Sequence, residues 1–367
     1  MKFSLDIAFF GSSLVSAYRN GSATYYRGIV RALAARGHRV TFFEPRIERR
    51  QRYRDLADPT WAEVVSYSGA DNHEVDRILE RARRADVLIK ATGIGVFDSI
   101  LEREIPRALK PGAMSIFWDV DVSTTLTRLR ANASDPLRGM LPRYDVVCTN
   151  AGGPSVVREY VDLGARLCVP VHPALDPSTH FPVPASTAWT ADASLLVNWS
   201  PDREQRVSDL FFDAASRLPE STFLLGGSGW DEIDAPANVR ALGHVYTAEH
   251  NGLNAGARCI LAPACDEMAS RGWAPPARMF EAAGAGACLI TNAWDGVDSF
   301  LEPDREVLVA KTGEEVAALI RDLQPVRGRT IGAAARARVL THHTYAQRAK
   351  LLDSILIAGA PTLEAAS

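Results

Sequence analysis

Residues 275–292 read PPARMFEAAGAGACLITN, and this stretch decides the fold of the C-terminal half of the chain. The two prolines favour the start of a helix, the alanines continue it, and Gly284 and Gly286 end it before the apolar run 287–291. A short apolar run that follows a turn is typical of a buried strand. The stretch therefore predicts a helix, a tight turn and a strand.

Two charged residues of this helix stand out. Arg278 and Glu281 lie three positions apart and share one helix face, whereas Met279, Ala282 and Ala283 can pack inward. A carboxylate beside a cation near a helix start can bind a sugar hydroxyl and a phosphate. A surface ion pair on an amphipathic helix gives the same spacing, and from these residues alone it is the better interpretation.

Apolar runs alternate with helical patterns along the whole chain, which predicts α/β architecture with mostly parallel sheets. The strands expected in chain order are 7–10, 39–43, 86–91, 113–118, 144–149, 167–171, 194–199, 222–225, 239–242, 258–262, 287–291 and 305–310. The proline-rich connector 172–184 interrupts this pattern and marks a domain boundary. We expect an N-terminal domain at 1–175, a C-terminal domain at 176–340, and a final helix with a frayed tail at 341–367.

Length and composition set limits on the class of protein. A chain of 367 residues exceeds what one core usually holds, which also favours two domains. A net charge of -3 gives no electrostatic reason to expect nucleic acid as a partner. No apolar segment approaches the length of a membrane span, and residues 1–6 lead into a strand instead of a signal peptide, so we expect a cytoplasmic protein. The five cysteines are irregularly spaced and read as reduced core residues.

Polar residues follow two of the expected N-terminal strands. The loop 11–21 is rich in glycine and serine but lacks the glycine patterns of dinucleotide and phosphate loops. Asp119 and Asp121 follow the strand at 113–118, at the edge where ligands of open α/β sheets gather. Three interpretations remain open: Asp119 faces an acceptor as a general base, both aspartates cap the next helix, or the pair holds a divalent metal, which ranks last.

The stretch 278–292, followed by Gly296, Phe300, Glu302 and Glu306, resembles the nucleotide-sugar site of GT-B glycosyltransferases. The chain is most similar to the CgeB-type (spore maturation protein B-like) family, through 11–21, 117–121, 172–177 and 225–230 as well. This resemblance implies two Rossmann-like domains facing across a cleft and a last helix that crosses back to the first domain. It also implies transfer of a sugar from a nucleoside diphosphate sugar to an acceptor, with no cofactor and no divalent metal.

The resemblance assigns roles to individual residues. Glu281 would hold the ribose hydroxyls, Arg278 and Arg203 would lie beside the diphosphate, and Asp119 is the candidate base. Further donor contacts are expected from the backbone at Gly227, although turn formation alone would explain this glycine. His244 or Tyr246 is expected to stack on the base, although core packing would also explain these rings. The residues expected to face the acceptor or the cleft are Ser12, Ser13, Tyr18, Asn20 and Asp121, although capping and ordering of the turn would also explain the four loop residues.

Two tryptophans depart from the pattern of the resembled family. Trp273 stands where many retaining enzymes carry an acidic residue, eight positions before Glu281, and Trp199 occupies the usual place of a phosphate-binding cation. These departures leave two alternatives open: a catalytically silent sugar or nucleotide sensor, and a nucleotide-sugar epimerase on the same fold. The donor base, the sugar and the acceptor are not indicated by the sequence.

Overall fold

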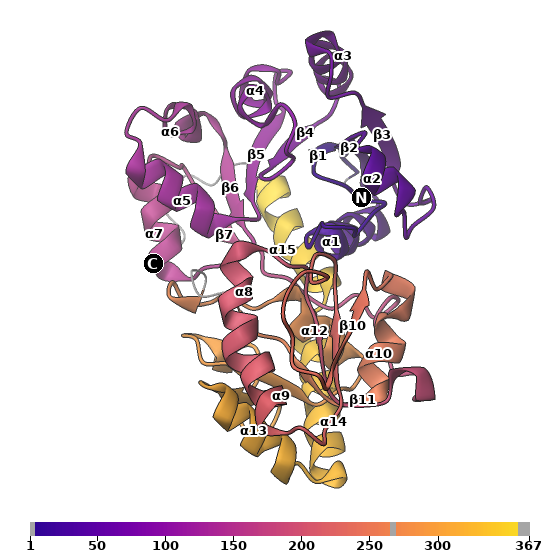
Figure 1. The fold of residues 1–367 in the computed structure, drawn as a ribbon. Helices are drawn as coiled ribbons and strands as arrows, with labels where there is room; N and C mark the ends of the chain where they lie inside the picture. The colour runs from indigo at the N-terminus through magenta and orange to yellow at the C-terminus, as the bar shows by residue number, and fades with distance from the viewer. Residues whose placement is uncertain (1–3, 265–268, 359–367) are drawn as a thin grey trace. The chain divides into compact units, whose positions relative to one another are not determined.

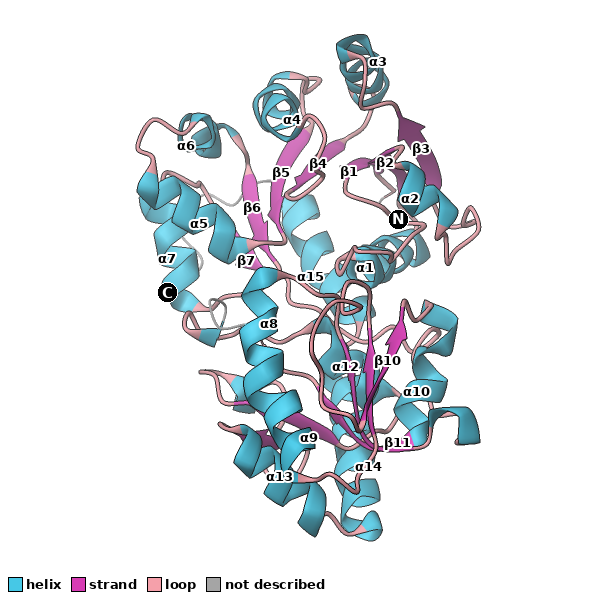
Figure 2. Ribbon diagram, in the orientation of Figure 1, coloured by secondary structure: helices cyan, strands magenta, loops and turns pink. Residues whose placement is uncertain are grey.

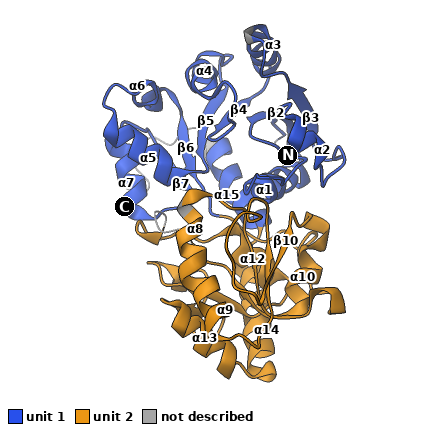
Figure 3. Ribbon diagram, in the orientation of Figure 1, with its two compact units in different colours: residues 1–172, 345–367 blue, residues 173–344 orange. Residues whose placement is uncertain are grey.

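A computed structural model describes residues 4–264 and 269–358 of the chain. The chain divides into two compact units, coloured separately in Figure 3. Unit 1 comprises Met1–His172 and Tyr345–Ser367, and unit 2 comprises Pro173–Thr344. The unit boundaries therefore lie at 172/173 and 344/345, within about four residues of the boundaries at 175/176 and 340/341 expected from the sequence.

Unit 1 is built on a seven-stranded sheet in the order β3-β2-β1-β4-β5-β6-β7, in which every pairing is parallel (Figure 1). Its strands are β1 (Asp6–Phe10), β2 (Arg39–Pro45), β3 (Glu63–Tyr67), β4 (Val87–Ala91), β5 (Met114–Asp119), β6 (Val146–Thr149) and β7 (Cys168–Pro170). The strand order reverses direction between β1 and β4, so the loops after these two strands flank the switch point where ligands of such sheets bind.

The last helix of the chain belongs to unit 1. Helix α15 (Tyr345–Ala358) packs on α1 (Ala23–Ala35) so closely that a Cβ on Gly28 would lie 2.1 Å from the Tyr345 ring. Asp353 of α15 accepts a hydrogen bond from His38 Nε2 at 2.8 Å. The expected return of the final helix to the first domain is therefore confirmed. The other helices of unit 1 are α2 (Glu48–Arg52), α3 (Asn72–Ala82), α4 (Asp98–Glu104), η1 (Ile105–Arg107), α5 (Val122–Ala131), α6 (Pro136–Met140), η2 (Leu141–Arg143) and α7 (Pro154–Asp162).

Unit 2 repeats the architecture with a six-stranded parallel sheet in the order β10-β9-β8-β11-β12-β13. Figure 2 draws the strands in magenta and the helices in cyan. Its strands are β8 (Ala191–Leu196), β9 (Phe223–Gly226), β10 (Val239–Gly243), β11 (Ala257–Leu261), β12 (Leu289–Asn292) and β13 (Leu308–Ala310). Its helices are η3 (Thr187–Trp189), α8 (Pro201–Val207), the π-helical turn η4 (Ser208–Phe212), α9 (Asp213–Arg217), η5 (Thr247–Glu249), α10 (His250–Gly256), α12 (Ala277–Gly284), η6 (Val297–Ser299), α13 (Gly313–Asp322) and α14 (Pro325–His342). The switch point of this sheet lies between β8 and β11.

Both faces of the unit 2 sheet are covered. Along β11, Cys259 and Leu261 belong to one buried cluster, whereas Ile260 belongs to the cluster on the other face. Alternation between two apolar clusters is expected of a parallel strand with helices on both sides. Met279, Ala282 and Ala283 of α12 are fully buried in the second cluster, as the sequence predicted.

Some elements differ from the sequence-based expectation. Strand β8 begins at Ala191 instead of residue 194, and the edge strand β3 and helices α10 and α13 were not expected. Cys148, Cys168, Cys259 and Cys288 are buried free thiols, as predicted, whereas Cys265 lies outside the described residues. In the part of the chain that the structure describes, no helix has both the length and the apolar character needed to span a bilayer.

Candidate functional site

The sequence-predicted donor residues of unit 2 follow four of its parallel strands, two of which flank the switch point. Arg203 lies on α8 after β8, and Arg278 and Glu281 lie on α12 after β11. Gly227 follows β9, and His244 and Tyr246 follow β10. Because the strands are parallel, all of these residues come after carboxyl ends on one edge of the sheet, which is where open α/β sheets bind ligands.

The Arg278–Glu281 pair is buried, so its interpretation as a surface ion pair is wrong. Arg278 Nη1 lies 3.4 Å from Glu281 Oε2, and the side chains are only 9% and 8% exposed. The Arg278 guanidinium also donates to Asn254 Oδ1 of α10. Burial lowers the pKa of Arg278, and the neighbouring Glu281 opposes this effect. A buried cation and carboxylate that are paired in this way are held in fixed positions.

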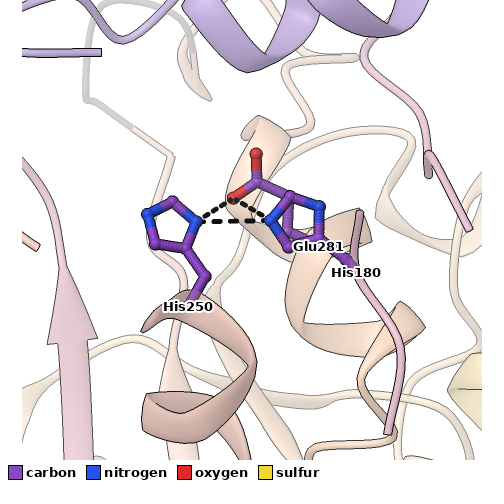
Figure 4. Close-up of side chains that lie close together, drawn as sticks. All are labelled: His180, His250 and Glu281. Atoms are coloured by element: carbon purple, nitrogen blue, oxygen red, sulfur yellow. Dashed lines mark hydrogen bonds and ion pairs between the residues drawn. The ribbon is translucent and has the colours of Figure 1, made fainter. Parts of the chain in front are cut away.

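Two histidines meet the same carboxylate oxygen (Figure 4). Glu281 Oε2 lies 3.9 Å from His180 Nε2 and 3.8 Å from His250 Nδ1, and the two nitrogens are 3.3 Å apart. The three side chains are buried, and their ligand atoms lie within 4.8 Å of one another. In Figure 4 the other carboxylate oxygen of Glu281 points away from both imidazoles. These are the ligand types and spacings of a transition-metal site.

Asn251 places the two histidines side by side. Its amide nitrogen donates to Thr179 O at 2.9 Å, and its carbonyl oxygen accepts from Phe181 N at 3.2 Å. Both bonds flank His180, and Asn251 itself follows His250 on α10. The segment before β8 is therefore fixed to α10 at the point where the two imidazoles stack, with ring centroids 5.5 Å apart.

The loops after β8 and β9 are bonded to each other. Asn198 Oδ1 accepts from Ser228 N at 3.0 Å, and the Asn198 carbonyl lies 3.4 Å from Arg203 Nη1. Gly227 adopts φ +125°, and a Cβ there would lie 1.9 Å from Val197 O. The glycine is thus required for close approach of two backbone segments, which explains its presence without a ligand.

The four aromatic or histidine side chains of unit 2 that the sequence singled out each contact a neighbouring side chain. The His244 and Tyr246 rings meet edge to face at 4.7 Å, and Tyr246 stays 36% exposed. Trp199, which is 37% exposed, donates its ring N–H to Glu204 at 2.9 Å. Trp273 has φ +52° and packs edge to face on Phe300. An exposed Tyr246 keeps a ring face for stacking, whereas Trp273 has a packing role.

The acceptor-side residues of unit 1 mostly order their own loop. Ser12 Oγ donates to Asn20 Oδ1 at 3.0 Å, and Asn20 Nδ2 donates to the carbonyls of Ser13 and Ser16. These side chains are buried, and Tyr18 stacks on Tyr53 at 4.2 Å. The loop after β1 is therefore a rigid, internally bonded turn at the switch point of unit 1.

Asp119 is fully buried, which does not match the general base expected there. Its Oδ1 accepts from Thr92 Oγ1, Asp121 N and Thr125 Oγ1, and its Oδ2 accepts from the Tyr160 hydroxyl. Burial raises the pKa of Asp119, and the hydrogen bonds from Tyr160, Asp121 and Thr92 oppose this effect. Asp121 is exposed and precedes α5 without a side-chain cap bond, so it does not cap the helix as one alternative predicted.

His180, His250 and Asn254 were not predicted as site residues. They lie 101, 31 and 27 positions before Glu281, and no spacing in the sequence links them to it. Imidazoles close to a strand end were visible at His172 and His244, and neither belongs to this cluster. The neighbours of Glu281 became evident only from the folded chain.

Comparisons with known proteins extend this description. A family model described as glycosyl transferase-like matches residues 203–354, and no curated protein matches the sequence. Sucrose-phosphate synthase of Thermosynechococcus elongatus has a similar structure, with a TM-score of 0.68, 13% identity, and coverage of 96% of this chain and 100% of that one. HepE of Anabaena, in complex with UDP and glucose, has a TM-score of 0.66 and 14% identity, with 97% and 100% covered.

A third similar structure is an alpha-glucosyltransferase in complex with UDP-glucose and DNA containing an abasic site. It has a TM-score of 0.67 and 12% identity, and 96% of this chain and 99% of that one are covered. At these identities the likeness establishes the fold. The GT-B fold expected from the sequence is therefore confirmed, with two parallel-sheet units of Rossmann-like topology and a returning C-terminal helix.

Proposed function

We propose that this protein is a glycosyltransferase of the CgeB type that transfers a sugar from a nucleoside diphosphate sugar to an acceptor hydroxyl. In this reaction the acceptor oxygen forms a bond to the anomeric carbon, the bond from that carbon to the diphosphate breaks, and the acceptor loses its proton. The nucleoside diphosphate leaves with the electron pair. Three similar structures contain UDP or UDP-glucose, which favours a uridine donor.

The observation that carries this proposal is the buried Arg278–Glu281 pair on α12, inside the segment matched by the glycosyl transferase-like model. Glu281 Oε2 contacts Arg278 Nη1 at 3.4 Å. The other carboxylate oxygen points away from both imidazoles, as Figure 4 shows. We assign that second oxygen to the ribose hydroxyls. A carboxylate can accept from two adjacent hydroxyls, which gives strong, charge-assisted bonds.

The leaving diphosphate needs positive charge nearby. Arg203 is only partly buried and its Nη1 lies 3.4 Å from a backbone carbonyl, so we propose that it contacts the diphosphate with the help of the helix N-terminus of α12. In this proposal the transfer step itself uses no divalent metal. Tyr246, exposed after β10, is the proposed stacking partner of the base.

Calorimetric titration with UDP, GDP and ADP tests the proposal. We expect one of them to bind wild-type protein, and Glu281→Gln to weaken that binding about ten- to hundredfold, because a charge-assisted bond contributes about 1.5–3 kcal/mol. Glutamine keeps the shape of the side chain and limits the disturbance of Arg278. Glu80→Ala is the matched control, since Glu80 also pairs with an arginine three positions away but is exposed.

Chelator-treated protein is used for these titrations, so that nucleotide binding is measured without metal. Absence of binding by wild type, or equal binding by Glu281→Gln, would refute the proposal. Incubation with UDP-glucose then distinguishes the activities: transfer to an added acceptor or release of UDP supports the transferase, whereas an epimer formed without acceptor identifies an isomerase.

A further inference from the structure

We propose that His180, His250 and Glu281 form a binding site for a divalent first-row transition metal, Zn²⁺ in the first place. The site lies entirely within unit 2 and does not depend on the proposed transferase activity. It combines the segment before β8 with α10 and α12, three parts of the chain that are far apart in sequence.

The distances between the three ligand atoms fit a metal ion. The sides of the triangle formed by His180 Nε2, His250 Nδ1 and Glu281 Oε2 are 3.3, 3.8 and 3.9 Å. The point equidistant from these corners lies about 2.1 Å from each, which is the length of Zn–N and Zn–O bonds in proteins. A single ion can therefore contact all three atoms without a large movement of any side chain.

Hydrogen bonding among the three groups is a poorer explanation of this geometry. The two contacts between imidazole nitrogen and carboxylate oxygen are 3.8 and 3.9 Å long, well beyond the usual range of such bonds. The two nitrogens face one another at 3.3 Å, although only one of them can donate if both rings are neutral. In the tautomers that protonate the other ring nitrogens, both facing nitrogens would direct a lone pair to the same point, which is the arrangement that a cation requires.

The surroundings of the site are those of a supported metal centre. Asn251 bonds to the backbone on both sides of His180, and Arg278 contacts the ligating oxygen of Glu281 at 3.4 Å while donating to Asn254. Ligating carboxylates are commonly hydrogen-bonded in this way by a second layer of residues. The positive charge of Arg278 lowers the affinity of the site for any cation. The hydrogen bond from Arg278 to Asn254 holds the guanidinium to one side of the metal position.

The ligand set also selects the metal. Two imidazole nitrogens and one carboxylate favour Zn²⁺, Co²⁺, Ni²⁺ or Fe²⁺, whereas Mg²⁺ and Ca²⁺ prefer oxygen ligands. Three protein ligands leave further coordination positions for solvent, and the second oxygen of Glu281 stays outside the metal site. Such an ion would fix the orientation of the Glu281 carboxylate in unit 2.

Metal binding by chelator-treated full-length protein, measured without nucleotide, tests the site. We expect one equivalent of Zn²⁺ to bind by calorimetry, and Co²⁺ to give the intense visible absorption of a four- or five-coordinate ion. His180→Gln and His250→Asn should each weaken binding at least about tenfold, the lower end of what loss of a supporting residue costs. His342→Ala is the matched control, because His342 is an exposed histidine of the same unit and should bind metal as wild type does.

Circular dichroism of each variant in chelator establishes that it is folded before its affinity is compared. If a histidine variant does not fold, the cobalt spectrum of the wild type alone decides whether the metal site exists. A weak spectrum typical of six-coordinate hydrated Co²⁺, no stoichiometric Zn²⁺ binding by wild type, or equal affinity of folded His250→Asn would overturn the proposal. Failure of nucleotide binding in chelator would affect only the proposed function.

Discussion

Replacing Asp119 with asparagine separates a structural role from a catalytic one. The substitution keeps the size of the side chain and removes its charge. Asp119 Oδ1 accepts hydrogen bonds of 2.9, 2.9 and 3.1 Å from Thr92, Asp121 N and Thr125, and Oδ2 accepts from Tyr160. The asparagine oxygen can keep the first three bonds, and its NH₂ group can donate to the Tyr160 oxygen.

The expected loss of stability follows from these contacts. A hydrogen bond to a charged group contributes about 1 kcal/mol more than a neutral one, so three bonds at Oδ1 lose about 3 kcal/mol. Part of this loss is offset because asparagine is less costly to bury than a carboxylate, whose pKa burial raises. We expect a net destabilisation of about 2 kcal/mol, which lowers the melting temperature by about 4–8 °C for a unit of this size.

The assay is thermal unfolding monitored by circular dichroism, followed by turnover of the donor at a temperature where the variant is folded. Asp121→Asn is the control, because Asp121 belongs to the same motif but is exposed and makes no side-chain cap bond; its effect should stay within about 0.5 kcal/mol. If Asp119→Asn were as stable as the wild type but had lost all turnover, the structural role would be refuted. Asp119 would then again be the candidate general base.

Three further substitutions test other buried contacts by the same unfolding measurements. Burial lowers the pKa of His172 from 6.5 to about 4, so the unfolded chain takes up the proton at a higher pH than the folded chain. As the pH falls through this window, the free energy of unfolding should drop by at most about 3 kcal/mol, and His172→Gln should abolish this drop. A variant with the acid profile of the wild type would show that His172 does not cause the drop. Gly227→Ala places a Cβ 1.9 Å from Val197 O and should lower the free energy of unfolding by at least about 3 kcal/mol. Gly243→Ala is the control, because a Cβ there has no atom within 4 Å; its φ of +66° alone should cost about 1 kcal/mol. Equal effects of the two substitutions would contradict the steric argument. Lys90→Met removes the fully buried ammonium that lies 2.7 Å from Asp98 and 3.3 Å from Glu102. The free energy of unfolding should fall by about 3 kcal/mol, because both carboxylates lose this cation. An unchanged stability would show that the two ion pairs make no net contribution.

The alternation of strands and helices was predictable because it is encoded in short stretches. The run 86–91 gave β4 and the stretch 275–292 gave α12 and β12, since apolar periodicity, prolines and glycines act within a few residues of one another. Elements without such local signals were missed. Strand β3 is a short edge strand of mixed polarity, and α10, with the sequence HNGLNAG, contains two glycines and two asparagines, which are poor helix formers.

The site was predictable only in part. The spacing of Arg278 and Glu281 indicated that they share a helix face, but the same spacing occurs in many exposed pairs, so burial could not be inferred. For Asp119, the position after a strand end suggested an accessible ligand group. The structure instead surrounds it with Thr92, Thr125 and Tyr160, whose hydroxyls come from other elements.

The sequence by itself determined the alternation of strands and helices, the two parallel-sheet units and the helix that carries Glu281, because these depend on interactions between near neighbours in the chain. Only the tertiary structure brought His180 and His250 to that carboxylate. The two imidazoles reach it through the crossing of α10, α12 and the segment before β8, and such long-range contacts leave no periodic trace in the sequence.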